Sequence, residues 1–147
     1  LERRNDPARG REDLERARAL LEPLVALDES DRALARVLAL VELGLSRAHE
    51  LEGRPEEALA VIRSFRAGAD RRLEAVPGQI EAAREALTAR QIEGRLLNQL
   101  GRDEECDRVL AEALAQARAL AERHPDHALL ADDHVVTLSL AADVELK

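Results

Sequence analysis

Aromatic side chains are almost absent from this sequence, since Phe65 is the only one and Trp, Tyr and Met do not occur. Any hydrophobic core must therefore be aliphatic. Proteins that bind single-stranded nucleic acids stack the bases on aromatic rings, and one Phe cannot supply such a platform. The net charge of −8 also disfavours nucleic acid, because phosphate binding depends on clustered Lys and Arg. The sequence therefore predicts no nucleic-acid partner.

Cysteine, methionine and long apolar runs are also scarce or missing. With Cys106 alone, no internal disulfide can form, which suits a reducing compartment. No apolar run approaches the roughly 18 residues of a transmembrane helix, and no signal peptide is visible. We therefore expect a cytoplasmic protein with no membrane partner. Because Met is absent, Leu1 is not a translation start, and we expect the chain to be a piece of a longer protein.

Strong helix formers (Ala, Leu, Arg and Glu) dominate what is present. Apolar residues make up 46% of the chain and charged residues 35%, and the charges alternate in sign as they do on solvated helix faces. The length fits one domain. We expect an all-α domain over residues 1–147, with residues 1–10 as a frayed lead-in.

Proline, glycine and capping residues divide the chain into six expected helices. Pro55 fits the first position of a helix, and Gly53 and Gly101 fit helix ends. Asp126 opens the final segment, where alternation of apolar residues leaves a strand as the alternative to a helix. We expect the first helix from Arg11 to Asp28, with Pro23 as a potential kink, and the second from an N-cap at Asp31 to Gly53. The third helix runs from Pro55 to just before Pro77, and the fourth from there to Gly101. The fifth runs from an N-cap at Asp103 to just before Pro125, and the sixth from Asp126 onward.

Two stretches align without gaps, SRAHELEGRPEEALAVI from Ser46 and GRLLNQLGRDEECDRVL from Gly94. Each has Gly-Arg at the turn between helices, a small residue seven positions before that glycine and another five positions after it. A turn glycine takes the left-handed conformation that ends a helix. Small residues allow two helix axes to cross closely.

This pattern resembles the tetratricopeptide repeat family. The matching positions are Leu45, Ser46, Gly53, Ala58 and Ile62 in one unit, and Gly94, Leu97, Gly101, Cys106 and Leu110 in the next. A partial match upstream comprises Ala17, Leu20 and Leu21. The resemblance implies an all-α fold of antiparallel helix hairpins, stacked as a short solenoid of about six helices.

The sequence departs from the family in two respects. The usual repeat is about 34 residues long, whereas Ala17, Ala58 and Cys106 are 41 and 48 residues apart. The family's aromatic positions are filled by Glu42, His49 and Arg90. An ordinary antiparallel helical bundle remains the alternative. In an array, the first and last helices would expose apolar stripes that flanking domains or a second copy of the chain could cover.

The resemblance also implies a partner-binding groove lined by the first helix of each pair. Its positions fall on Leu43, Arg47 and Glu50 in one helix, and on a polar set in the next: Thr88, Gln91, Arg95 and Asn98. The guanidinium and amide donors suit a carboxylate or a peptide backbone. The alternative is that these are ordinary solvated side chains.

Histidines and carboxylates cluster near the C-terminus, at His124, His127, Asp132, Asp133 and His134. Imidazole and carboxylate both bind zinc and iron. However, His127 and His134 are about two helical turns apart, too far to share one metal on a straight helix. We therefore expect turn and surface roles, and neither a metal nor a cofactor.

Cys106 occupies a helix-crossing position and is expected to be buried and inert. Its neighbours Glu104, Glu105 and Asp107 oppose a reactive thiolate. No phosphate-binding loop or catalytic triad order is visible. We therefore expect a non-enzymatic module that binds a peptide or partner domain, or self-associates, as a homodimer for example. The resemblance suggests a bacterial-type signalling or regulatory protein as its context. A ligand-sensing or metal-dependent bundle that uses His124–His134 is the competing hypothesis.

Overall fold

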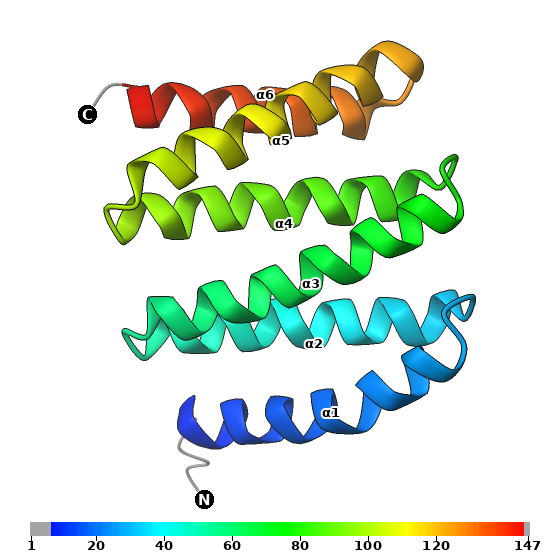
Figure 1. Cartoon of the computed structure of the whole chain (residues 1–147), viewed down its shortest axis with the longest axis vertical. Helices are drawn as coiled ribbons and strands as arrows, with labels where there is room; N and C mark the ends of the chain where they lie inside the picture. Colours follow the sequence, from blue (N-terminus) through cyan, green and yellow to red (C-terminus); the bar gives the residue numbers. More distant parts are fainter. Residues whose placement is uncertain (1–6, 146–147) are drawn as a thin grey trace, which may run out of the picture. The chain divides into compact units, whose positions relative to one another are not determined.

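The computed structural model describes residues 7–145, and every regular element in that range is a helix (Figure 1). The predicted all-α class is confirmed, and the C-terminal segment is helical, not a strand. The helices are α1 (Pro7–Leu27), α2 (Arg32–Leu51), α3 (Pro55–Ala75), α4 (Ile80–Gln99), α5 (Asp103–Arg123) and α6 (Ala128–Glu145).

The chain divides into two compact units between Phe65 and Arg66, within α3. In the first unit α1 packs against α2, and α2 contacts the first half of α3. In the second unit α5 packs against α4 and α6, and α4 also contacts α6. Consecutive helices run in opposite directions within each unit, as their colours in Figure 1 show. Each unit is therefore built from antiparallel helix hairpins.

Two glycines end helices in the way the sequence predicts. Gly53 has a φ of 71° and Gly101 a φ of 68°. After each glycine the arginine N–H reaches back to a carbonyl of the preceding helix, Arg54 to His49 and Arg102 to Leu97, both at 2.9 Å. These bonds satisfy carbonyls that would otherwise lack a partner at the helix end. The same arginines then pair with Glu57 and Glu105 in the first turn of the next helix.

The small residues lie at close helix crossings, and each pair is joined by a hydrogen bond. In the first unit the Ser46 hydroxyl on α2 donates to the Ala58 carbonyl on α3 at 3.3 Å. In the second unit the donor is on the other helix, since the Cys106 thiol on α5 donates to the Gly94 carbonyl at 3.2 Å. Cys106 is fully buried, as predicted.

The helices recur at one spacing. Helices α1, α3 and α5 begin at residues 7, 55 and 103, and α2, α4 and α6 begin at 32, 80 and 128, so both sets are 48 residues apart. This corrects the interval of 41 residues expected upstream. The position that corresponds to Ala58 and Cys106 is Gly10, two helical turns before Ala17, where the sequence match was placed.

Three helix starts also differ from expectation. Helix α1 begins at Pro7 instead of Arg11, so residues 7–10 are helical, and residues 1–6 lie outside the described chain. Asp103 is the first residue of α5 and Arg102 occupies the N-cap, whereas Asp31 does cap α2 by accepting from the N–H groups of Ala33 and Leu34. Helix α6 begins at Ala128, two residues after Asp126.

The core is aliphatic, and alanine is its most frequent residue. Phe65 is 2% exposed and lies with Leu59, Val61 and Ile62 among the buried side chains of the first unit. In the second unit Leu87 packs against two alanines of α5, Ala113 and Ala117. Alanine allows close approach of helix backbones, which explains how a core nearly without aromatics fills its space.

Helix α1 changes direction along its length in Figure 1. Pro23 lies within it and cannot donate a hydrogen bond to the Ala19 carbonyl. The predicted proline kink thus has a physical cause at this position. Among the described residues, no helix is long and apolar enough to cross a membrane.

Candidate functional site

The predicted groove residues of α2 lie on its solvent-facing side. Arg47 is exposed, and Leu43 and Glu50 are partly buried. Arg36 and Leu40 continue the same side at steps of four and three residues, and Leu40 is 62% exposed. We call these five residues the α2 face. Sequence reasoning missed Arg36 and Leu40, although the helical spacing from Leu43 would have indicated both.

The arginines of the α2 face differ from most others in the chain. Many arginines pair with a carboxylate, as Arg11 does with Glu15 and Glu52. By contrast, Arg36 and Arg47 form no ion pair with any residue in the range 7–145. A helix face that combines an exposed leucine with two unpaired cations is suited to a ligand that carries both apolar groups and carboxylates.

The predicted groove residues of α4, namely Thr88, Gln91, Arg95 and Asn98, are all partly buried. Gln91 points at α6: its amide donates to the Thr137 hydroxyl at 2.8 Å and to the Asp133 carbonyl at 3.4 Å. One turn before Thr88, Arg84 makes two hydrogen bonds to the Asp133 carboxylate, which raises the pKa of the guanidinium. Helix α6 thus covers part of this side of α4. Gln91 joins the two helices through its amide, whether or not it also lines a groove.

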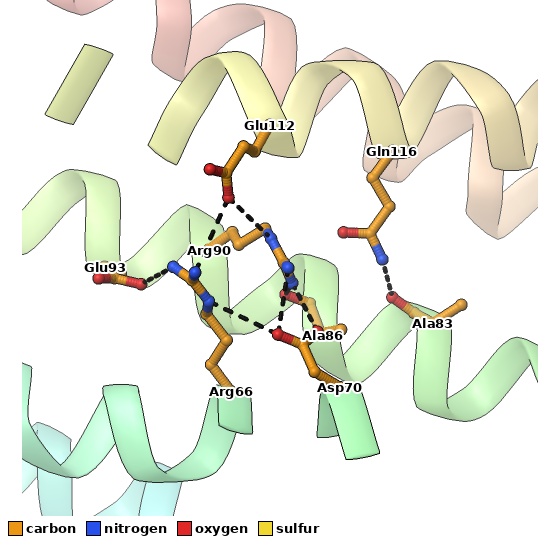
Figure 2. Close-up of polar contacts among 8 residues, drawn as sticks. All are labelled: Arg66, Asp70, Ala83, Ala86, Arg90, Glu93, Glu112 and Gln116. Carbon is orange, nitrogen blue, oxygen red and sulfur yellow. Dashed lines mark hydrogen bonds and ion pairs between the residues drawn. The ribbon is translucent and has the colours of Figure 1, made fainter. Parts of the chain in front are cut away.

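A network of charged side chains joins α3, α4 and α5 in the second unit. Figure 2 shows two guanidinium groups, of Arg66 and Arg90, between three carboxylates. Arg66 lies 2.6 Å from Glu93, and Arg90 contacts both oxygens of Asp70 at 3.0 and 3.2 Å. Glu112 on α5 approaches Arg90 to 3.6 Å and Arg66 to 3.8 Å. Glu93 is only 3% exposed, so this network stands where a core would normally be apolar.

The first unit repeats this arrangement at corresponding positions. Arg18 on α1, 48 residues before Arg66, contacts Glu22 at 2.8 Å and Glu42 on α2 at 3.5 Å, and donates to the Ser64 hydroxyl on α3 at 2.9 Å. Glu42 is 4% exposed and corresponds to Arg90. Glu42 and Arg90 are therefore each held by ion pairs within their own unit. Every carboxylate in the two networks contacts a guanidinium group, so we interpret both networks as structural.

His49 on α2 is also buried and is 6% exposed. Burial lowers its pKa, and the nearby cations Arg54 and Arg11 lower it further. Its Nδ1 has no hydrogen-bond partner among the described residues. The imidazole is therefore held in its neutral form within the first unit.

Protonation of His49 should destabilise the fold. Because its folded pKa lies below the unperturbed 6.5, its stabilising contribution is complete above pH 6.5 and is lost as the pH falls toward the folded pKa. We expect the melting temperature of the parent chain to fall more steeply than that of His49→Gln between about pH 7 and pH 5. Thermal melts followed by circular dichroism would measure this, and parallel slopes would contradict it.

The C-terminal histidines do not converge. His124 follows the end of α5, His127 precedes α6, and His134 lies within α6. Asp133 is engaged by Arg84. Across residues 7–145 no group of three or more metal-ligating side chains is close enough to hold an ion. His124 and His127 lie in the connection between α5 and α6, and all three imidazoles are partly buried.

Comparison with protein-family models, curated proteins and solved structures gives no match to this chain. The resemblance to tetratricopeptide repeats therefore depends on the quoted residues alone. Functional inference has to start from the surfaces and contacts described above. Of these, the α2 face is the best-defined candidate site, because Leu40 is exposed and Arg36 and Arg47 form no ion pair with any described residue.

Proposed function

We propose that this chain is a non-enzymatic protein-interaction module of the tetratricopeptide-like helical repeat type, acting within a larger signalling or regulatory protein. The 48-residue spacing of the helices supports the repeat interpretation. The matched glycine turns and helix crossings support it further. The single buried Cys106 fits a cytoplasmic location.

The ligand that the α2 face fits best is an acidic amphipathic peptide segment. Leu40 and Leu43 would contact its apolar side chains, and Arg36 and Arg47 would pair with its carboxylates. The observation that carries this proposal is the absence of any intramolecular ion pair at these two arginines in the described chain. In a protein with a net charge of −8, a local cationic stripe gives orientation and selectivity to binding.

Fluorescence polarisation with a labelled peptide would test this function. The probe is a helical peptide with Leu at every third or fourth position and Glu between them. We expect Arg47→Glu to weaken its binding roughly tenfold, because one surface attraction is lost and a repulsion of similar size replaces it, about 1–2 kcal/mol in all. Higher salt should weaken binding by the parent chain.

Two controls make the outcome specific. Arg108→Glu changes the charge equally at an exposed site on α5 that is not part of the α2 face, and should leave affinity nearly unchanged. A peptide with Lys in place of each Glu should bind more weakly than the acidic probe. Equal losses in the Arg47 and Arg108 variants, or equal affinity for both peptides, would reject the α2 face as the binding site.

A further inference from the structure

Helix α6 exposes an apolar stripe along one side. Val135 is 61% exposed and Leu138 is 46% exposed, and the exposed Ala131 and Ala142 lie on the same side. These residues follow one another at steps of three and four, so they form one continuous line on the helix surface. A line of this kind on a helix normally packs against a neighbour.

On α2 and α4, the rows of residues at the corresponding positions are covered by the next helix in the chain, which is α3 for α2 and α5 for α4. On α4 the residues 48 positions earlier are Ala83, Leu87, Arg90 and Gly94. Helix α5 covers all four, through the Gln116 amide on the Ala83 carbonyl, Ala113 and Ala117 on Leu87, Glu112 at Arg90, and the Cys106 thiol on the Gly94 carbonyl. On α2 the crossing residue Ser46 is also hydrogen-bonded to the following helix, with its hydroxyl donating to the Ala58 carbonyl on α3. Helix α6 thus has the docking surface of its counterparts but no described helix on it.

Helix α1 has the complementary surface. It corresponds to α3 and α5, and the side on which α5 meets α4 maps onto Gly10, Ala17 and Leu20 of α1. On that side Leu20 is 72% exposed and Leu24 is 46% exposed. Gly10 holds the small-residue crossing position and is exposed, and a Cβ there would meet nothing within 4 Å. Within residues 7–145, helix α1 therefore has no partner on that side of the kind that α3 and α5 have.

Charge favours pairing α6 with α1 over pairing α6 with itself. Helix α6 contains four acidic residues and neither Lys nor Arg, which gives a formal charge of −4. Arg84 compensates Asp133, so two α6 helices side by side would bring six uncompensated negative charges together. Helix α1 contains four Arg and four acidic residues and is formally neutral. Contact between α6 and α1 avoids that repulsion.

We propose that a second copy of this chain docks its α1 against the α6 stripe, with Gly10 crossing at Ala142. The contact is heterologous, because it joins different surfaces of the two copies, so each copy carries both halves of the contact. It uses neither Arg36 nor Arg47 and does not depend on ligand binding by the α2 face. Self-association and peptide binding can consequently fail or succeed independently.

Light scattering across a concentration series tests the contact. We expect the mean mass of the parent chain to rise progressively with concentration, beyond a dimer. Leu138→Glu on α6 and Leu20→Glu on α1 should each abolish the rise, since each places a carboxylate in the contact. The matched controls are Val136→Glu, which changes an equally exposed residue outside the stripe, and Ala19→Glu on α1. Both controls should associate like the parent.

Mixing the Leu138→Glu and Leu20→Glu variants tests whether α1 of one copy binds α6 of the other. The Leu138→Glu copy keeps an intact α1, and the Leu20→Glu copy keeps an intact α6, so an equimolar mixture should form a dimer and nothing larger. A parent chain that stays monomeric throughout, a mixture that forms no dimer, or a closed dimer that either variant retains by itself would overturn the proposal. Circular dichroism of each variant verifies that it is folded, which is expected because Leu20 and Leu138 are largely exposed.

Discussion

Replacing Glu93 with alanine is expected to lower the free energy of unfolding by about 2–3 kcal/mol. Removing one partner of a buried ion pair typically costs about 3–5 kcal/mol, because the other charge is left without compensation. We expect a smaller loss for Glu93→Ala, because the Arg66 side chain is 26% exposed and keeps more distant contacts to Asp70 and Glu112. Denaturant unfolding followed by circular dichroism would measure the change, as the chain has no Trp for fluorescence.

Two further variants distinguish the loss of the ion pair from a simple loss of packing. Glu104→Ala removes a carboxylate from an exposed position and should change stability by less than about 0.5 kcal/mol. The double variant Arg66→Met with Glu93→Leu replaces both charges by apolar groups and should regain much of the loss. If Glu93→Ala is as mild as Glu104→Ala, the network does not support the unit in the way we infer.

Gly94→Ala is the second change with a large expected effect. A Cβ at this position would lie 2.5 Å from Leu110 Cδ2 and 2.8 Å from Leu110 Cγ, and Leu110 is itself buried. Helices α4 and α5 would have to move apart at the crossing. Overpacking of this kind typically costs about 1–3 kcal/mol, and here it must exceed the gain of about 1 kcal/mol in helix propensity. We expect a net loss of about 1–2 kcal/mol.

A glycine elsewhere provides the comparison. Gly68 lies within α3, where a Cβ would meet only guanidinium ends of Arg71 and Arg72, the nearest at 3.4 Å. Gly68→Ala should therefore raise the free energy of unfolding by up to about 1 kcal/mol through helix propensity. Opposite signs for the two glycine variants would show that the crossing constrains Gly94. A stabilised Gly94→Ala would mean that Leu110 has room to move.

Features that depend on neighbours in the chain could be predicted from the sequence. The Gly53 and Gly101 turns require a left-handed conformation that glycine adopts most easily, so their place in the sequence fixes the helix ends. The burial of Ala58 and Cys106 follows from helical periodicity. The helix starts at Pro7 and Ala128 were less certain, because a first turn without a strong cap leaves little trace in the sequence.

The candidate site was predictable only in part. The resemblance assigned Arg47 and Leu43 to a groove, and in the structure Arg47 is exposed whereas Leu43 is partly buried. The same resemblance assigned Gln91 to the groove, yet its amide donates a hydrogen bond to Thr137 on α6. The sequence cannot show that contact, because it joins residues 46 positions apart through the packing of two helices.

The sequence alone determined that the chain is helical, where most helices end and which small residues meet at crossings, because these depend on local backbone geometry and on a period of 3.6 residues. Only the tertiary structure decided how the polar residues inside the helix packing are accommodated. Glu42 is buried because Arg18 reaches it from α1, and Arg90 because Asp70 and Glu112 reach it from α3 and α5. A buried charge is tolerated only with a partner at hydrogen-bonding distance, and that partner is chosen by how helices pack.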